Sequence, residues 1–153
     1  MLQRPEGQSR IVGLDVGEAR IGVALSDPLR LTAQPLLVLE RETEEADLQR
    51  IQFLIDSHEA ELVVVGMPVS LSGAEGPAYE RMQKFVRALA DALPVPVVTW
   101  DERLTTVEAQ RRMRAAGEGE REQRGVVDKV AASIILQSYL DAHRREKRAD
   151  DVR

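Results

Sequence analysis

Residues 10–26 read RIVGLDVGEARIGVALS, and this stretch decides the fold. Two apolar segments rich in β-branched residues, 10–15 and 20–26, are separated by a short connection that contains Gly17. A short glycine-containing connection between two such segments is typical of a β-hairpin. The stretch therefore predicts two antiparallel strands, with Asp15 close to the end of the first.

The pattern after this hairpin alternates between strand and helix. A third strand is expected over 35–39, and residues 48–55 then place apolar side chains at helical spacing. The apolar run 62–65 is typical of a strand buried on both faces. A second helix is expected over 79–93 and a second buried strand over 95–100. This order predicts an α/β fold with a mixed five-stranded sheet, in which a three-strand antiparallel meander precedes two parallel strands flanked by helices.

Two further helices are expected to complete the domain. One begins near Thr105, because Thr105 and Glu108 have the spacing of a capping box, and it ends at Gly117. The other covers about 126–143 and follows a loop rich in Gly, Glu and Arg.

The composition limits the kind of protein and the kind of site. A chain of 153 residues, 43% of them hydrophobic, is large enough for one domain with its own core. We expect that domain at 10–143, between flexible tails at 1–9 and 144–153. The absence of cysteine and the presence of only two histidines exclude thiol catalysis and leave oxygen atoms as the ligands for any metal. Because no segment has the pattern of a membrane span or a signal peptide, we expect a soluble, cytoplasmic protein that binds no membrane.

The net charge of −5 is unevenly distributed along the chain. Residues 40–61 contain eight acidic and two basic residues, a balance of −6, so the remaining residues sum to about neutral. Lys and Arg are the residues that neutralise nucleic-acid phosphates. The distribution therefore allows one acidic face and a separate face that binds phosphate.

Acidic side chains follow the ends of the expected strands, where ligands collect in open α/β sheets. Asp15 lies in an apolar segment, so its carboxylate needs a partner such as a cation, unless it only caps the turn at Gly17. Asp101 and Glu102 follow the last expected strand. Spacing alone leaves open which of these two faces Asp15, and both could be acids favoured at a helix N-terminus.

A third acid lies on the last expected helix. Asp128 shares a helix face with Ala131 and Ala132, whose small side chains would let this helix approach the strand ends closely. The alternative is an ordinary acid in the first turn of the helix. Carboxylates without His or Cys suit Mg²⁺ or Mn²⁺. Two such ions could activate water and stabilise the leaving oxygen of a phosphoryl displacement, so the three acids together predict a two-metal site.

Other residues near the strand ends could contact phosphate. Gly66 and Pro68 could bring backbone amides near a phosphate, although an ordinary strand-to-helix loop explains them equally. Arg20 and Arg103 could donate two hydrogen bonds each to phosphate, with surface ion pairs as the alternative. Residues expected to have structural roles are Gly17, Gly22, Thr105, Ala131 and Ala132.

Four ordered motifs together resemble the YqgF family of bacterial proteins. They are GLDVGEARIGVALSD at 13–27, VGMP at 65–68, DERLTT at 101–106 and DKVAASIILQSYL at 128–140. That family is regarded as a pre-16S ribosomal RNA nuclease and, by similarity to RuvC-type resolvases, also as a Holliday junction resolvase. The resemblance implies an RNase H-like fold with three metal-binding acids, and it favours Glu102 over Asp101. In this chain those acids are Asp15, Glu102 and Asp128.

The chain differs from that family in the loop before the last helix. This loop is often strongly basic in relatives, whereas residues 117–125 alternate in sign here. We expect phosphate contacts from Arg121 and Arg124 of this loop. Arg111 and Arg112 of the preceding helix could compensate for its low net charge, because phosphate contacts can come from any element.

These observations predict a metal-dependent nuclease, a monomer or homodimer, that acts on precursor rRNA at the 5′ end of 16S rRNA. The second hypothesis is a resolvase of branched DNA, which needs a homodimer to make two symmetric cuts. An ATP-binding protein of the broader fold is a third, but such proteins enclose the nucleotide between two domains of this kind. A non-catalytic RNA-binding module is a fourth, and the presence of all three acids speaks against it.

Overall fold

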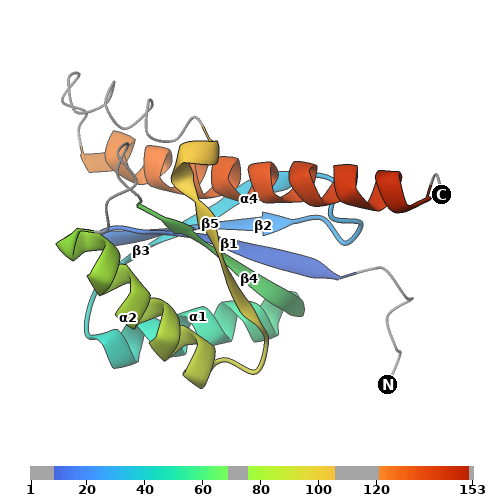
Figure 1. Ribbon diagram of the computed structural model, residues 1–153. Helices are drawn as coiled ribbons and strands as arrows, with labels where there is room; N and C mark the ends of the chain where they lie inside the picture. Colours follow the sequence, from blue (N-terminus) through green and yellow to red (C-terminus); the bar gives the residue numbers. More distant parts are fainter. Residues whose placement is uncertain (1–8, 69–75, 106–120, 152–153) are drawn as a thin grey trace.

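The computed structural model describes residues 9–68, 76–105 and 121–151 (Figure 1). One mixed sheet forms the centre, with α1 and α2 on one face and α4 along the other (Figure 1). The strands are β1 (Arg10–Val16), β2 (Arg20–Ser26), β3 (Ala33–Glu40), β4 (Ala60–Met67) and β5 (Val97–Asp101). The helices are α1 (Glu44–His58), α2 (Pro77–Ala92), the 3₁₀ helix η1 (Glu102–Leu104) and α4 (Arg121–Asp151).

The sheet has the strand order β3-β2-β1-β4-β5. β1 pairs antiparallel with β2, and β2 pairs antiparallel with β3. β4 pairs parallel with β1 and with β5, because helices make the crossovers between these strands. The predicted fold, a three-strand antiparallel meander followed by two parallel strands, is therefore confirmed.

Alternating side chains of the strands supply two separate cores. Val12 and Leu14 of β1 belong to the core under α1 and α2, whereas Ile11 belongs to the core under α4. On β4, Val63 and Val65 face the first core and Val64 the second. Since both faces are covered, these strands are apolar at nearly every position, as parallel strands in α/β sheets usually are.

Two expected elements differ from those observed. β5 is an edge strand, and its residues are half-buried or exposed rather than buried as expected. α4 begins at Arg121 rather than near Val126, and it continues to Asp151 through residues expected to form a tail. Residues 121–125 are therefore helical, not part of a loop.

The helix predicted to begin near Thr105 lies mostly outside the described residues. Thr105 is the C-terminal cap of η1, and its backbone N–H donates to the carbonyl of Glu102 at 3.0 Å. The division of the chain into a domain at 10–143 and two tails stays a prediction. Among the helices that the structure describes, none has the length and apolar character needed to cross a lipid bilayer.

Candidate functional site

Asp15 lies on the α4 side of the sheet, at the carboxyl end of β1. It pairs with Gly22 of β2, and it follows Leu14, which pairs with Val65 of β4. Successive residues of a strand point to opposite faces, so Asp15 faces the same way as Gly13, whose Cα lies against α4. The Asp15 side chain is almost fully enclosed, because the residue is only 4% exposed.

Glycines in the sheet allow α4 to come close to Asp15. A Cβ atom at Gly13 would lie 2.8 Å from the Cβ of Leu136, and one at Gly22 would overlap the backbone of Asp128. The facing side of α4 carries Ala131 and Ala132, which are 1% and 0% exposed. Asp128 therefore lies over Gly22, the residue that pairs with Asp15.

Glu102 lies on the same α4 side of the sheet, beside the ends of β4 and β5. It is the first residue of η1, directly after β5, and it is 6% exposed. A Cβ atom at Gly66 would lie 3.1 Å from Oε1 of Glu102, so the absence of a side chain at Gly66 makes room for this carboxylate. Gly66 follows Val65, the partner of Leu14, and thus lies level with Asp15. The Thr105 hydroxyl donates to the Glu102 carbonyl at 2.7 Å and stabilises the turn.

Asp101 has a different environment from its neighbour. Its carboxylate accepts hydrogen bonds from the Arg103 side chain at 2.7 Å and from the Arg103 backbone N–H at 2.9 Å. The guanidinium of Arg103 holds the pKa of Asp101 below its ordinary value, although partial burial acts in the opposite direction. Asp101 therefore serves as the cap of η1, whereas Glu102 points inward; spacing alone could not separate the two.

Asp128 forms an ion pair with Arg20. The Nε atom of Arg20 lies 2.7 Å from Oδ2 of Asp128, and the two side chains are 20% and 18% exposed. Arg20 begins β2, on the α4 side of the sheet, two residues before Gly22. The sequence left two alternatives for Arg20 and Arg103, phosphate binding or an ion pair. In this structure both arginines form ion pairs, Arg20 with Asp128 and Arg103 with Asp101.

The donor set has the chemistry of a site for a hard divalent cation. Asp15 and Glu102 are buried carboxylates, and carboxylate oxygens are the ligands that hard divalent cations prefer. Within the described residues, however, no three acidic or histidine side chains are close enough together to hold a metal ion. Asp128 could complete such a group only if its ion pair with Arg20 opened. The residues therefore fit a divalent cation in type and burial, with this rearrangement as a condition.

The remaining predicted residues are distributed as follows. The Gly17 N–H donates to the Arg20 carbonyl at 2.8 Å and closes the β1–β2 turn. Pro68 lies just after β4, beside that turn. Arg111 and Arg112 lie outside the described residues, and for Arg121 and Arg124 the structure describes only the helical backbone of α4.

The sequence did not predict an ion-pair network that connects the β1–β2 turn to the start of α1. Arg41 donates to the Gly17 carbonyl at 3.1 Å and to the carboxylate of Asp47 at 3.2 Å. Arg50 donates to the same carboxylate at 2.5 Å, and Asp47 is 0% exposed. One feature of the sequence could have indicated this network: Asp47 lies four residues before Ile51, on the same face of the helix.

The sheet order and the helices on both faces define an RNase H-like fold. Solved structures that share this fold include those of two Holliday junction resolvases. The Thermus thermophilus RuvC in complex with a Holliday junction substrate superposes with a TM-score of 0.58, covering 89% of this chain and 96% of that chain at 16% identity. The fowlpox virus resolvase in complex with Holliday junction DNA gives a TM-score of 0.51, covering 87% and 97% at 10% identity. At these identities the likeness concerns the fold alone.

The chain belongs to the RuvX/YqgF family. The family model described as "RuvX: Holliday junction resolvase" matches residues 9–142. A relative from Halothermothrix orenii is 51% identical over 86% of this chain and 94% of its own length. Another from Syntrophus aciditrophicus is 49% identical over 94% of this chain and 95% of its own length. Both carry the name "Putative pre-16S rRNA nuclease".

Proposed function

We propose that this protein is a divalent-cation-dependent nuclease that hydrolyses phosphodiester bonds in precursor rRNA, at the 5′ end of 16S rRNA. The observation that carries the proposal is the burial of Asp15 and Glu102 on one face of the sheet, level with each other and beneath α4. The names of the relatives support the substrate, and a substrate of this kind puts the activity in the cytoplasm.

Asp15, Glu102 and Asp128 are proposed to hold Mg²⁺ or Mn²⁺, with two ions as the expected number. A cation bound there supplies activation of the attacking water and stabilisation of the leaving oxygen. Strand pairing fixes the backbone of Asp15, a hydrogen bond from Thr105 supports the backbone of Glu102, and the burial of both residues limits the movement of their side chains. Fixed ligands of this kind hold the reacting groups in line without reorganisation during the reaction.

Basic residues around the acids are proposed to position the phosphate backbone. Arg20 and Arg103 lie next to Asp128 and Asp101, so each has to exchange a carboxylate for a phosphate oxygen when substrate binds. Both groups accept two hydrogen bonds from a guanidinium. Arg111, Arg112, Arg121 and Arg124 are proposed to add phosphate contacts, and Gly66 and Pro68 to let the backbone approach.

The experiment that tests the proposal is cleavage of a labelled 16S rRNA 5′ leader and a labelled four-way DNA junction, side by side, with Mg²⁺ or Mn²⁺. Glu102→Gln is expected to lower the rate at least about 100-fold, as loss of an electrostatic group at a reaction centre does. Asp15→Asn and Asp128→Asn should have the same effect. The products should carry 5′-phosphate and 3′-hydroxyl ends.

Asp101→Asn is the matched control for Glu102→Gln. It removes one negative charge at the neighbouring residue, whose carboxylate pairs with Arg103 instead of facing Asp15. We expect its rate to stay within a few-fold of the wild-type rate. Equal losses in both variants, or 3′-phosphate products, would contradict the proposed site.

A Holliday junction resolvase is the second candidate function. The description of the family model and the shared fold of RuvC support it. Two symmetric cuts need two copies of the site related by a two-fold axis, so this candidate requires a homodimer, whereas cleavage of an rRNA leader does not. Faster cutting of the junction than of the leader, together with a dimeric mass in solution, would favour the resolvase.

A further inference from the structure

We infer that a pocket next to the candidate site takes an unpaired nucleotide of the substrate strand, adjacent to the cleaved bond. The pocket has a volume of about 490 Å³ and is bordered by Val16 and Gly17, the residues that directly follow Asp15. Volumes of about 300–1,000 Å³ are typical of small-molecule sites. The inference rests on the proposed nuclease function, because it assigns a place to the strand being cut.

The pocket lies on the other side of the β1–β2 turn from the three acids. Asp15 faces α4, and Val16, the next residue of β1, packs against the core under α1 and α2. A strand that crosses this edge of the sheet can thus leave one phosphate at the acids and turn the neighbouring nucleotide into the pocket.

The floor of the pocket is apolar. Met82 and Phe85 of α2 form its base and are 8% and 4% exposed. Pro68 and Ala78 border it beside the end of β4 and the start of α2. An apolar floor suits the faces of a nucleobase, which bind by stacking and van der Waals contact whatever the sequence.

Arg41 forms one wall, and its position is fixed before any ligand arrives. Its Nε donates to the fully buried Asp47 at 3.2 Å, and an Nη atom donates to the Gly17 carbonyl at 3.1 Å. Its guanidinium carbon lies 5.0 Å from the centre of the Phe85 ring. Guanidinium planes are surfaces on which unpaired bases stack, so this wall is suited to a base.

Cationic side chains from α2 stand at the rim. Arg81 and Lys84 line the pocket one turn apart, and both are exposed. Two carboxylates, Glu18 and Glu44, also line it. Arg81 already pairs with Glu18 at 3.4 Å, and their side chains are 67% and 91% exposed, respectively. Together with Arg41 the rim has three cations against two carboxylates, and Lys84 has no ion-pair partner among the described residues.

Filling the pocket tests the inference most directly. Ala78→Trp places an indole at its border, and Ala78→Ser is the matched control at the same exposed position. Binding of a fluorescein-labelled eight-nucleotide single-stranded RNA, and of the blunt duplex of the same sequence, is measured by anisotropy in EDTA. We expect Ala78→Trp to weaken single-strand binding about tenfold, as loss of one stacked base does. Duplex binding should change less, because paired bases cannot enter the pocket.

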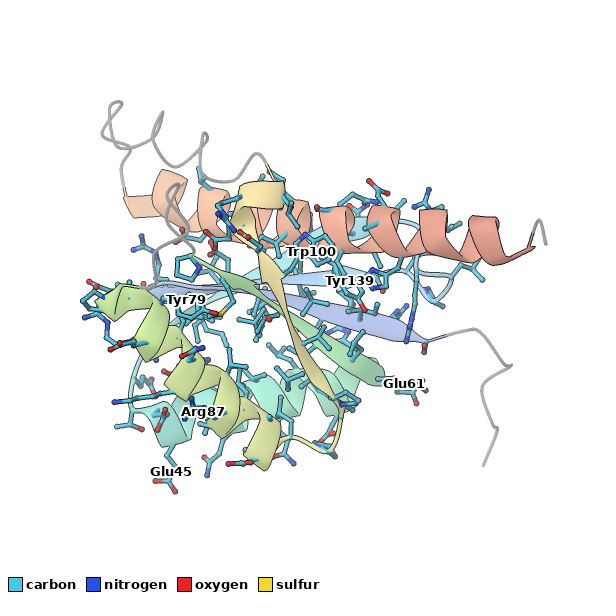
Figure 2. All side chains as sticks on the ribbon, viewed as in Figure 1. Glu45, Glu61, Tyr79, Arg87, Trp100 and Tyr139 are labelled. Carbon is cyan, nitrogen blue, oxygen red and sulfur yellow. The ribbon has the colours of Figure 1, made fainter. Side chains whose placement is uncertain are left out.

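The rim is tested by charge. Arg81→Gln and Lys84→Gln should each weaken single-strand binding and reduce the slope of log affinity against log salt by about 0.7, the value for one phosphate contact. Arg87→Gln is the control, because Arg87 is exposed on the same helix (Figure 2) but does not line the pocket. Equal affinities for Ala78→Trp and Ala78→Ser, or equal slopes for the rim and control variants, overturn the inference.

These measurements separate the pocket from the catalytic proposal, because binding is followed without a divalent cation. If neither RNA nor DNA is cut but the pocket variants still lose single-strand affinity, the nuclease proposal fails and the pocket stands. If the wild type cuts RNA and Ala78→Trp binds as Ala78→Ser does, the pocket alone fails.

Discussion

Gly22 controls how closely the last helix approaches the sheet. A Cβ atom at this position would overlap the backbone carbonyl of Asp128, and backbone cannot move aside as a flexible side chain can. Gly22 also pairs with Asp15, so one glycine fixes the approach of two of the three predicted metal ligands. Gly22 allows this close approach because glycine has no Cβ atom.

Gly22→Ala should therefore push α4 away from β2. We expect the free energy of unfolding to fall by about 1–3 kcal/mol or more, as in other overpacked sites, when it is measured by urea denaturation. Gly76→Ser serves as the comparison, because nothing lies within 4 Å of a Cβ there and serine is favoured at a helix N-cap. Equal stability of Gly22→Ala and the wild type would mean that α4 does not pack as described.

Arg20 forms an ion pair with Asp128, which we propose as a metal ligand, so Arg20 should compete with a bound cation for this carboxylate. Removing the guanidinium in Arg20→Gln should strengthen Mn²⁺ binding a few-fold, since partly exposed ion pairs contribute about 0.2–1 kcal/mol. Isothermal titration of the protein with Mn²⁺, without nucleic acid, measures this. Arg103→Gln makes the same change of charge beside Asp101 and should have a smaller effect. Weaker Mn²⁺ binding by Arg20→Gln would instead show that Arg20 orients Asp128.

At this scale the sequence allowed part of the site to be predicted. The positions of Asp15, Asp128 and the pair Asp101–Glu102 relative to the strand ends could be predicted, whereas the choice of Glu102 came from the resemblance to the YqgF family. The structure places Asp15, Glu102 and Asp128 on one side of the sheet. Their role as metal ligands stays a prediction. The pairing of Arg20 with Asp128 could not be foreseen, because it depends on the rotation of α4 about its axis, which spacing does not define.

At the scale of elements, α1 is attached to the β1–β2 turn by a buried carboxylate. Burial alone would raise the pKa of Asp47, but hydrogen bonds from the Glu42 N–H, Arg50 and Arg41 outweigh it, so the pKa lies below its ordinary value. The ionised form is therefore the one that the folded protein stabilises. Arg41 extends the network to the Gly17 carbonyl, two residues from Asp15.

This network predicts a dependence of stability on pH. A group whose pKa is lower in the folded state contributes stability above its unfolded pKa of about 3.9, and that contribution is lost as the pH falls through the folded pKa. Asp47→Asn should lose about 1.5–3 kcal/mol at pH 7, the range for hydrogen bonds to charged groups. Urea denaturation at pH 7 and at pH 3 should show the gap to wild type narrowing at the lower pH. A constant gap would contradict the pKa argument.

The extent of α4 shows why element boundaries were harder to predict than elements. The helix is expected to begin near 126, after a loop rich in Gly, Glu and Arg, and a glycine such as Gly125 costs a helix about 1 kcal/mol relative to alanine. The neighbouring residues 121–124 and 144–149 are mostly strong helix formers, however, and α4 continues through both segments. Charged residues without apolar periodicity predict a tail at 144–153, whereas in the structure Arg144 donates to the Leu31 carbonyl at 2.6 Å and holds this part of α4 against the loop before β3.

At the scale of the whole molecule, metal binding should stabilise the fold, because the proposed ligands come from β1, η1 and α4. A cation at a concentration 100 times its dissociation constant should add about 2.7 kcal/mol. Thermal unfolding with Mg²⁺, with Mn²⁺ and with EDTA measures this. Asp15→Asn should lose the gain and Asp101→Asn should keep it. A shift of equal size in both variants would show that the ions bind elsewhere.

The sheet order followed from general rules, whereas the pocket did not. A hairpin fixes β1 beside β2, and parallel crossovers then place β4 and β5 on the free side of β1. The pocket is bordered by β1, α2 and the start of α1, together with the residue after β4. Its shape depends on how these side chains pack in three dimensions, and no local pattern in the sequence contains that information.

α4 covers β1, β2 and β3 on one face of the sheet, although it follows all five strands along the chain. Ile11, Ala24 and Val64 are buried by a helix that starts only at Arg121 (Figure 1). A chain still emerging during synthesis therefore presents a bare apolar sheet face, the kind of surface that chaperones protect from aggregation. Asp128 arrives with the same helix. On the proposed function, the site lacks its third acid until α4 has packed against the sheet, so cutting activity begins only at that step of folding.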